Sequence, residues 1–228
     1  MTYTISVIIP AHNEESQIAE ALDSLTSQTC KNFEVIVVAN GCTDGTAKIA
    51  QSYINKLSIK IFETKQRGIA FACNHGAKHS KAKFLFFLEA DTVISHNGIA
   101  AAVNALNQGK IGGTLKMRSK EKKVWYRLGT KLLEFDEGAG WGPVRFCTAE
   151  VYRNIRGHNE SIGWMIDADF AKRVKAQGPT IYVKDATQTT SMRRFEKGGF
   201  GEVIKQAYAY TLFLLTGKIK KGEYPVVR

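Results

Sequence analysis

The sequence predicts an α/β fold with a mostly parallel, doubly wound sheet. Segments rich in β-branched and apolar residues alternate along the chain with segments whose apolar residues recur at helical spacing. Strands that alternate with helices in this way form a parallel sheet with helices on both faces. The 228 residues are 44% hydrophobic, and a chain of this length can bury its core as one domain. We therefore predict a single domain over residues 1–228.

The predicted elements follow one another closely in the first half of the chain. The strand-like runs are YTISVIIP, FEVIVVAN, LSIKIFE and AKFLFFLEA, and residues 14–29, 43–57 and 69–80 between them have helical character. Thr43 and Asp44 are candidate caps for the second helix. From about residue 111 the pattern loosens into a glycine-rich strand (IGGTLKM), a basic amphipathic segment and the loop GAGWGP, and a last strand begins at Thr180. This second half is predicted to elaborate the first and to share its core.

Two acids follow the fourth predicted strand, in the stretch FLEADT. Glu89 and Asp91 flank Ala90 directly after a run of apolar residues. Ligands of open α/β sheets bind beyond the carboxyl ends of the strands, and hard divalent cations that bridge diphosphates take one or two carboxylates. The alternative is structural: Glu89 caps a loop, and Asp91 caps a helix that starts near Ser95. Taken alone, the triplet favours this structural role.

Charge and cysteine content narrow the class of protein. The chain has 32 basic and 21 acidic residues, and its net charge of +11 favours anionic partners such as nucleotides, phospholipid surfaces or nucleic acid. Its four cysteines are too widely spaced for a metal knuckle, and we interpret them as reduced thiols. The first residues lack the regions of a signal peptide, and the apolar stretch AYAYTLFLL is far shorter than the ~20 residues of a membrane span. These features predict a cytoplasmic protein.

Several motifs occur in an order that is typical of one enzyme family. PAHNEE follows the first strand, NGCTDGT the second and FLEADT the fourth, and NIRGHNESIGWMIDADF precedes the last strand. In this order they resemble family 2 glycosyltransferases with the GT-A fold, over most of residues 4–185. The resemblance implies a Rossmann-like sheet with a C-terminal acceptor-side elaboration and a terminal helix. Residues 1–110 would bind the nucleotide sugar, and residues 111–228 would form the acceptor side and the C-terminal helix.

The resemblance also implies a reaction and a metal. The enzyme would move a sugar from a UDP- or GDP-linked donor to an acceptor hydroxyl, with inversion at the sugar and with Mg²⁺ or Mn²⁺ on the diphosphate. Asp91 aligns with the metal-binding acid of the family, and Glu89 with the acid that contacts the ribose or a metal-bound water. Further donor contacts implied by the match are Pro10, Ala11, His12, Glu14, Asn40, Arg67, Ala90, Arg193 and Arg194.

Some of these donor contacts have an equally ordinary structural explanation. Asn13 and Glu14 could serve as cap and first-turn acid of the following helix. Asn40 stands where the family more often has aspartate, so it keeps hydrogen-bonding capacity without the charge. Arg67 could be a solvated loop arginine, whereas two adjacent arginine forks after the last strand suit diphosphate oxygens.

The segment WMIDADF carries the candidate general base. Asp167 aligns with the catalytic aspartate of the family, which takes the proton from the acceptor hydroxyl. The alternative is that Asp167 caps a helix and Asp169 is a first-turn acid, and for Asp169 we prefer this structural role. His158, Glu160 and Trp141 are predicted on the acceptor side, although a lone histidine in a loop is more often simply exposed.

The C-terminal segment combines an apolar stripe with lysines. Residues 203–215 hold apolar side chains at helical spacing, and Lys218, Lys220 and Lys221 follow. Such a stripe is usually core or the interface of a homodimer. The minority interpretation is a peripheral contact with an anionic membrane at its inner face, where the acceptor would be lipid-linked.

Other classes of protein fit the sequence less well. A sugar-phosphate nucleotidyltransferase would carry a glycine-rich signature after its first strand, where PAHNEE stands instead. A non-catalytic nucleotide- or anion-binding protein is the other alternative. A nucleic-acid-binding protein would leave the acids after the buried strand unexplained, so no nucleic-acid partner is predicted.

Overall fold

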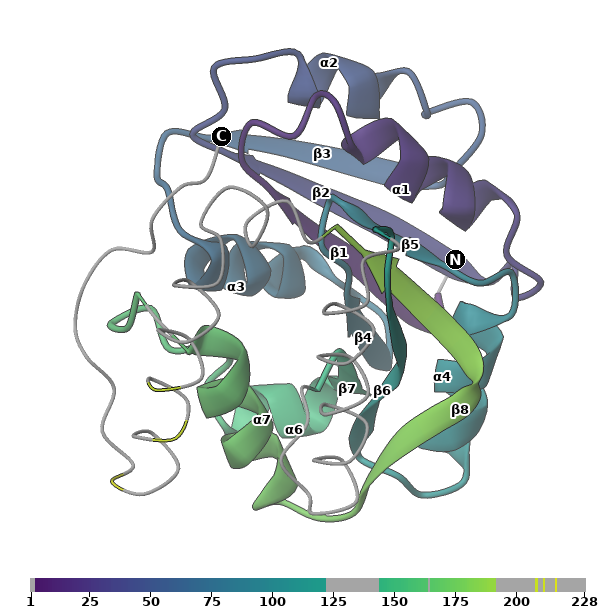
Figure 1. The fold of residues 1–228 in the computed structure, drawn as a ribbon, viewed down its shortest axis with the longest axis vertical. Coiled ribbons are helices and arrows are strands. Elements are labelled where there is room, and N and C mark those ends of the chain that lie inside the picture. The colour runs from purple at the N-terminus through teal and green to yellow at the C-terminus, as the bar shows by residue number, and fades with distance from the viewer. Residues whose placement is uncertain are drawn as a thin grey trace.

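The computed structural model describes residues 3–121, 144–163 and 165–191, with Tyr208, Thr211 and Thr216 further along the chain. These residues form one curved sheet with helices on both faces, which confirms the predicted α/β class (Figure 1). The elements are β1 (Ile5–Ala11), α1 (Ile18–Thr26), β2 (Phe33–Asn40), α2 (Thr46–Gln51), β3 (Ile59–Thr64), α3 (Ile69–His79), β4 (Phe84–Phe87), β5 (Thr92–Ile94), α4 (Gly98–Asn107), β6 (Gly112–Ser119), β7 (Phe146–Thr148), α6 (Ala149–Asn154), α7 (Ile166–Lys175) and β8 (Thr180–Thr190).

The strands of the described residues lie in the order β3-β2-β1-β4-β7-β6-β8-β5. The first four of this order pair in parallel, so their carboxyl ends meet at one edge of the sheet. β6 and β8 are also parallel, whereas β7 runs antiparallel between β4 and β6, and β5 pairs antiparallel with β8. The mostly parallel sheet is confirmed, and the antiparallel strands β5 and β7 are parts that the alternating sequence pattern did not predict.

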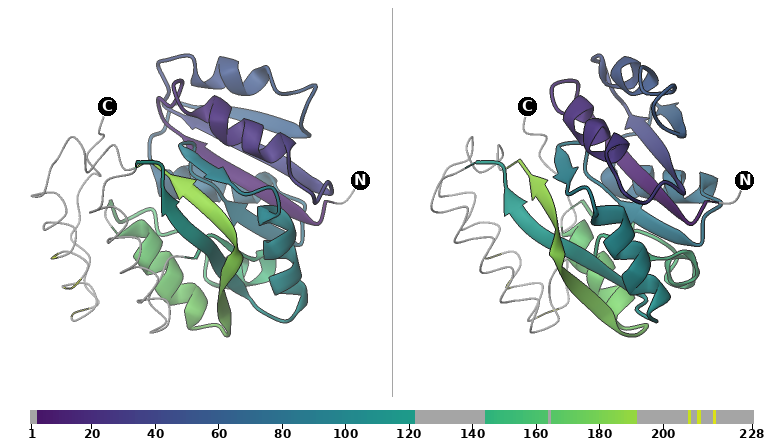
Figure 2. Two further views of the ribbon diagram at one scale, coloured as in Figure 1. Left: turned by 45° about the vertical axis from the view of Figure 1, so that its right-hand side comes forward. Right: turned by 90° about the vertical axis from the view of Figure 1, so that its right-hand side faces the viewer.

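The helices cover the sheet in two layers, each with its own apolar core. α1, α2 and α4 lie on one face, and α3, α6 and α7 on the other (Figures 1 and 2). Side chains of β1 alternate between the layers: Val7 packs with Leu22 of α1, and Ile8 packs with Cys73 of α3 and Phe170 of α7. Burying one such aliphatic or aromatic side chain stabilises the fold by about 1.5–3 kcal/mol.

Two glycines bring the central strands close together. A Cβ on Gly113 would collide with the backbone oxygen of Ile181 and the ring of Phe146, and a Cβ on Gly112 would collide with the backbone of β7. This approach fixes the residue that precedes β7. The backbone amide of Arg145 donates to Gly113 O at 2.7 Å, and Phe87 N donates to Arg145 O at 2.7 Å.

Several predicted element boundaries are wrong. α1 begins at Ile18 rather than near residue 14, and its N-cap Gln17 makes no side-chain cap bond, so Asn13 and Glu14 are not cap and first-turn acid. The reason is that Asn13 turns the chain with a φ of 55° and bonds to the next loop. α2 ends at Gln51, well short of residue 57. After Asp91 the chain forms β5 and α4 starts only at Gly98, so Asp91 caps no helix near Ser95.

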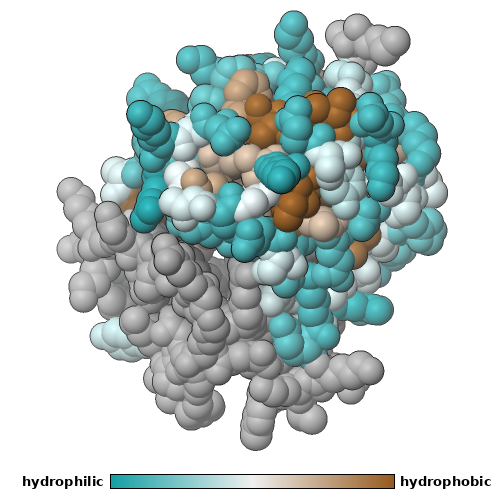
Figure 3. Space-filling view, turned by 90° about the horizontal axis from the view of Figure 1, so that it is seen from above, coloured by the Kyte–Doolittle hydropathy of each residue, from teal (hydrophilic) through white to brown (hydrophobic). Residues whose placement is uncertain are grey.

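The surface on the side of α2 carries both apolar and hydrophilic side chains. Figure 3 shows apolar side chains in small groups between hydrophilic ones on this side of the molecule. Among the described residues, the large apolar side chains that stay exposed are Ile54, Ile69 and Tyr208. No helix in the part of the chain that the structure describes is long and apolar enough to cross a membrane.

Candidate active site

The two acids of FLEADT lie in the turn after β4, at the edge where the parallel strands end. Thr92 N donates to Glu89 O at 3.0 Å, which closes the turn. Thr190, the last residue of β8, donates its hydroxyl to Asp91 Oδ1 at 3.5 Å. Asp91 therefore lies between the end of β4 and the end of β8, two elements that are distant in sequence.

Arg145 joins the acids after β4 to the acids of α7. Its guanidinium Nη2 lies 2.8 Å from Glu89 Oε1 and 3.3 Å from Asp167 Oδ2. The arginine side chain is only 13% exposed, whereas those of Glu89 and Asp167 are 42% and 48% exposed. Arg145 belongs to none of the motifs in the sequence. The one feature that marks it there is a charge between the loop GAGWGP and a buried strand.

The positive charge of Arg145 and the negative charges of Glu89 and Asp167 stabilise one another. Burial alone would lower the pKa of Arg145, but the neighbouring carboxylates of Asp167 and Glu89 outweigh it and raise the pKa. The arginine is therefore a permanent cation. Burial also raises the pKa of the adjacent Cys73 thiol, with a contribution from Asp167, so this thiol stays protonated. An arginine between two half-exposed acids leaves both acids accessible to a ligand.

The loop after β1 is held by the side chain of Asn40. The Asn40 amide donates to Ala11 O at 2.8 Å and accepts from Gly68 N at 3.1 Å, and the side chain is buried. Asn40 O in turn contacts His12 Nδ1 at 2.8 Å. Asn40 thus connects three loops at the carboxyl edge, and its amide nitrogen and oxygen are both used inside the protein.

The other ring nitrogen of His12 is buried, and none of the described residues is its hydrogen-bond partner. Pro10 and Ala11 end β1 beside this ring. Arg67 crosses the adjacent loop: its side chain packs over Gly41, where a Cβ would collide with the arginine Cγ. The structure therefore brings the predicted donor-side residues of the first three loops together at one edge of the sheet.

The loops after β1 and β2 are laced together by polar side chains. Thr43 N donates to Asn13 Oδ1 at 2.8 Å, Gly45 N donates to Glu15 Oε2 at 2.8 Å, and Glu14 N donates to Thr46 Oγ1 at 2.8 Å. We call this set of contacts the loop lacing. It places Glu14 in the contact between the two loops.

Asp44 contacts the start of α2, but Gly45 holds the N-cap position and makes no side-chain cap bond, so the prediction of Asp44 as the cap is not met. Its Oδ1 accepts from Thr46 N at 3.0 Å. Burial would raise the pKa of Asp44, but hydrogen bonds from Thr46 and Glu15 outweigh it and lower the pKa. The prediction for Thr43 as a cap is not met, since its contacts go to Asn13.

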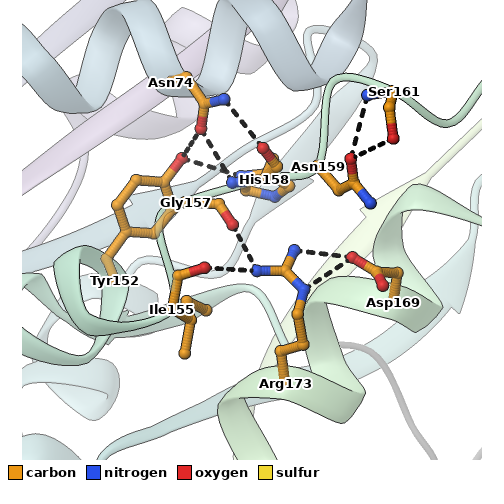
Figure 4. Close-up of polar contacts among 9 residues, drawn as sticks. All are labelled: Asn74, Tyr152, Ile155, Gly157, His158, Asn159, Ser161, Asp169 and Arg173. Carbon is orange, nitrogen blue, oxygen red and sulfur yellow. Dashed lines mark hydrogen bonds and ion pairs between the residues drawn. The ribbon is translucent and has the colours of Figure 1, made fainter.

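A second polar network surrounds His158 (Figure 4). Asn74 of α3 accepts from His158 N at 2.8 Å and donates to His158 O at 2.9 Å and to Glu160 Oε1 at 2.7 Å. Tyr152 donates its hydroxyl to Asn74 Oδ1 at 2.6 Å. Gly157 permits this closeness, because it has a φ of 68° and a Cβ there would collide with Asn74 Oδ1.

His158 is a neutral core residue rather than an exposed loop histidine. Its ring stacks on Phe170 with the centroids 4.1 Å apart and meets Phe87 edge-on at 4.9 Å. Burial, with the nearby charges of Arg173 and Arg145, lowers the pKa of His158 to about 3. Because Tyr152 gives its proton to Asn74, His158 Nδ1 must donate to the tyrosine oxygen, 2.9 Å away.

Asp169 has the structural role that we preferred for it. Its carboxylate pairs with Arg173, with Nε to Oδ2 at 2.8 Å, one turn further along α7. Arg173 also donates to Ile155 O at 2.9 Å and to Gly157 O at 2.7 Å. This arginine therefore ties α7 to the loop that carries His158.

A hollow of about 500 Å³ opens beside this network. Its size is within the range of pockets that hold small ligands. The lining residues come from α3, from the loop after α6 and from α7. They are Asn74, Ile155, Arg156, His158, Asn159, Glu160, Ser161 and Arg173.

We expect Asn74→Ala to lower the free energy of unfolding by about 1–3 kcal/mol, because it leaves buried backbone groups of His158 without partners. Urea unfolding of the two proteins measures this difference. Asn104→Ala is the matched control, since Asn104 is exposed on α4 and should change stability by about 0.5 kcal/mol at most. Equal losses in the two variants would show that the network does not stabilise the fold.

The residues present suit a metal site in which a bound diphosphate would supply the remaining metal ligands. No cluster of three or more histidine, cysteine or acidic side chains occurs within the described ranges. Mg²⁺ and Mn²⁺ sites on diphosphates need only one or two carboxylates, with phosphate oxygens and water as the other ligands. Asp91 offers such a carboxylate, whereas the charge of Glu89 is already matched by Arg145.

Part of the predicted site lies outside the described residues. This applies to Arg193 and Arg194, to Trp141 and to the C-terminal apolar stripe apart from Tyr208 and Thr211. Their predicted contacts with diphosphate, acceptor, membrane or a second subunit stay predictions.

Comparison with solved structures identifies the fold. A mannosyltransferase from Pyrobaculum calidifontis, in complex with GDP-Man and Mn²⁺, superposes with a TM-score of 0.73 at 20% identity, over 99% of this chain and 66% of that one. TarS of Staphylococcus aureus in complex with UDP-GlcNAc superposes with a TM-score of 0.70 at 20% identity, over 82% and 58%. The fold is that of the GT-A glycosyltransferases, as predicted.

Sequence comparison identifies the family. The profile of "Glycosyl transferase family 2" matches residues 6–169. The chain therefore belongs to glycosyl transferase family 2. An uncharacterized glycosyltransferase of Rickettsia typhi is 38% identical over 104 residues, which is 46% of this chain and 32% of that protein. The S. aureus poly(ribitol-phosphate) beta-N-acetylglucosaminyltransferase TarS is 34% identical over 107 residues, 45% and 19% of the two chains. The matches thus span about a third or less of these relatives.

Proposed function

We propose that this chain transfers a sugar from a UDP- or GDP-linked donor to an acceptor hydroxyl, with Asp167 as the general base. The observation that carries the proposal is the convergence of Glu89 and Asp167 on Arg145, beside Asp91 at the carboxyl edge of the sheet. Acids from two distant segments of a family 2 domain meet there, at the edge where α/β sheets bind their ligands.

The donor is assigned to the loops at this edge. Asp91 would hold Mg²⁺ or Mn²⁺, whose charge would neutralise the diphosphate of the donor and help it to leave. His12 Nε2, buried and without a partner among the described residues, is available to hydrogen-bond the nucleoside. Asn40 holds the loops that carry these contacts. The solved relatives support this donor class, since their structures contain UDP-GlcNAc or GDP-Man.

Asp167 performs the proton transfer. Its carboxylate takes the proton of the acceptor hydroxyl while the oxygen attacks the anomeric carbon. The bond from that carbon to the diphosphate breaks, and the nucleotide leaves with the bonding electrons. One in-line displacement inverts the configuration of the sugar. The half-exposed side chain of Asp167 leaves room for the acceptor to approach.

We assign the acceptor to the hollow between α3 and α7. Its walls carry hydrogen-bonding groups suited to a hydroxylated molecule, among them Asn159, Glu160 and Ser161. We assign Glu160 to the acceptor side, where Asn74 donates a hydrogen bond to its carboxylate. His158 forms the buried floor of the hollow through its contacts with Phe170.

The proposal predicts that UDP or GDP raises the melting temperature of the protein when Mn²⁺ is present, and that EDTA removes most of this effect. The physical reason is that ligands which bind only the folded state stabilise it by mass action, and the metal links the diphosphate to Asp91. A thermal-shift panel of nucleoside diphosphates and nucleotide sugars, with and without Mn²⁺, measures it. ATP serves as the control nucleotide. If no nucleotide shifts the transition under any condition, the proposed function is wrong.

A further inference from the structure

The proposed reaction gives no role to the guanidinium of Arg145, although this residue contacts both Glu89 and Asp167. Its backbone is fixed on both sides, by Gly113 of β6 and by Phe87 of β4. Its side chain cannot withdraw into solvent without breaking its ion pairs, since only 13% of it is exposed. The guanidinium is thus a fixed reference point between the end of β4 and the start of α7.

The two ion pairs of Arg145 differ in quality. The contact with Glu89 has the length of a strong charge-assisted hydrogen bond, 2.8 Å. The contacts with Asp167 are longer, 3.3 Å from Nη2 and 3.4 Å from Nη1. Glu89 therefore anchors the guanidinium, and the anchored guanidinium restrains the carboxylate of Asp167 without fully occupying it.

The helix itself does not orient Asp167. Asp167 lies in the first turn of α7, but the N-cap position is taken by Met165, which has a left-handed φ of 57° and makes no side-chain cap bond. Asp169, two residues further on, is held by Arg173 instead. Within the described residues, the polar contacts of the Asp167 side chain are those with Arg145.

We propose that Arg145 is a positioning residue that orients Asp167 for proton transfer, and that Glu89 serves to anchor Arg145 rather than to bind the metal. This inference rests on the proposed function of Asp167. Glutamate suits the anchoring role because its side chain is longer than that of aspartate and reaches Arg145, directly before β7. A carboxylate neutralised by a guanidinium at 2.8 Å is also a poor ligand for a divalent cation.

A double-mutant cycle of Arg145→Gln and Asp167→Asn tests this positioning role. Misplacing a reacting group by about 1 Å can cost 10²-fold in rate, so Arg145→Gln should lower kcat by about that factor. The KM for the donor should change by about threefold at most, because the donor is assigned to Asp91 and the loops after β1 and β2 rather than to Arg145. The double variant should be no slower than Asp167→Asn alone, since Arg145 acts through Asp167. Additive losses in kcat would overturn the proposal.

Two more conservative variants test the same role if Arg145→Gln fails to fold. Arg145→Lys keeps the charge but loses the fork, and it should recover part of the lost turnover. Glu89→Gln should retain Mn²⁺-dependent UDP binding within about threefold while kcat falls, because the guanidinium loses its stronger anchor. Loss of metal-dependent binding in Glu89→Gln would make Glu89 a metal ligand and overturn the anchoring role.

Two further measurements separate this inference from the proposed function. Nucleotide binding by the wild-type protein with Mn²⁺ tests the function alone. The unfolding equilibrium constants of the four proteins in the cycle then give the coupling of Arg145 with Asp167 independently of turnover. A coupling below about twofold would overturn the proposal that Arg145 restrains Asp167. Lys60→Gln is the control for a broken ion pair. Lys60 on β3 pairs with the buried Glu34 on β2, away from the site. This variant should change stability but not kcat.

Discussion

Asp167→Asn is expected to lower turnover by about 10²- to 10⁴-fold while donor affinity stays close to that of the wild type. Asparagine keeps the shape of the side chain and can still accept a hydrogen bond from Arg145, but it cannot take a proton. The donor diphosphate is assigned to Asp91 and the loops after β1 and β2, so its binding should not depend on the charge of Asp167. Steady-state transfer and calorimetric binding of UDP with Mn²⁺ measure the two quantities on one preparation.

The alternative interpretation of Asp167 as a helix cap predicts a different outcome. Asparagine is as good an N-cap as aspartate, so a capping role would leave both activity and melting temperature nearly unchanged. The structure already speaks against a cap, because Met165 holds the N-cap position of α7. Asp169→Asn is the matched control on the same turn, and it should lower stability through the loss of its pair with Arg173 rather than lower turnover. Normal turnover of Asp167→Asn on the true acceptor would exclude Asp167 as the base.

Asp91→Asn is expected to abolish the metal-dependent part of nucleotide binding. An amide oxygen is a weaker ligand than a carboxylate for a hard divalent cation. Loss of an outer-shell partner alone lowers metal affinity by about 10- to 100-fold, so loss of the ligand charge should weaken Mn²⁺-dependent UDP binding by at least about as much. Titration calorimetry with UDP in Mn²⁺ and in EDTA compares the variant with the wild type.

The control for Asp91 is an acid of the same sheet that no ligand should reach. Asp185→Asn changes an exposed residue of β8 and removes the same charge from the protein. It should bind UDP with Mn²⁺ as the wild type does. Undiminished metal-dependent binding in Asp91→Asn would remove Asp91 from the site.

Much of the fold could be predicted because local patterns dominate the first half of the chain. β1, β2 and β4 are nearly continuous apolar runs, and α3 was predicted almost to the residue. The central antiparallel strand β7 could not be predicted, because a segment of three residues carries too little periodicity to register as a strand. Its place between β4 and β6 depends instead on the close approach that Gly112 and Gly113 permit.

Sequence motifs indicated part of the candidate site, whereas its other residues join it only through tertiary contacts. Asp91 and Asp167 stand in recognisable motifs, and the fold brings their strand and helix ends together. Arg145 could not be found from sequence, because both of its partners are remote in the chain. His158 was predicted on the acceptor side, with an exposed loop histidine as the alternative, yet stacking on Phe170 and the hydrogen bonds of Asn74 bury it.

The loop lacing makes the segments after β1 and β2 one cooperative unit. Asn13, Glu14 and Glu15 on one loop bond to Thr43, Gly45 and Thr46 on the other, so neither loop can open without the other. If a nucleotide binds here as proposed, it meets a surface whose conformational entropy was already lost on folding. Less of its binding free energy is then consumed in ordering the protein, and the affinity for a weakly held nucleoside rises accordingly.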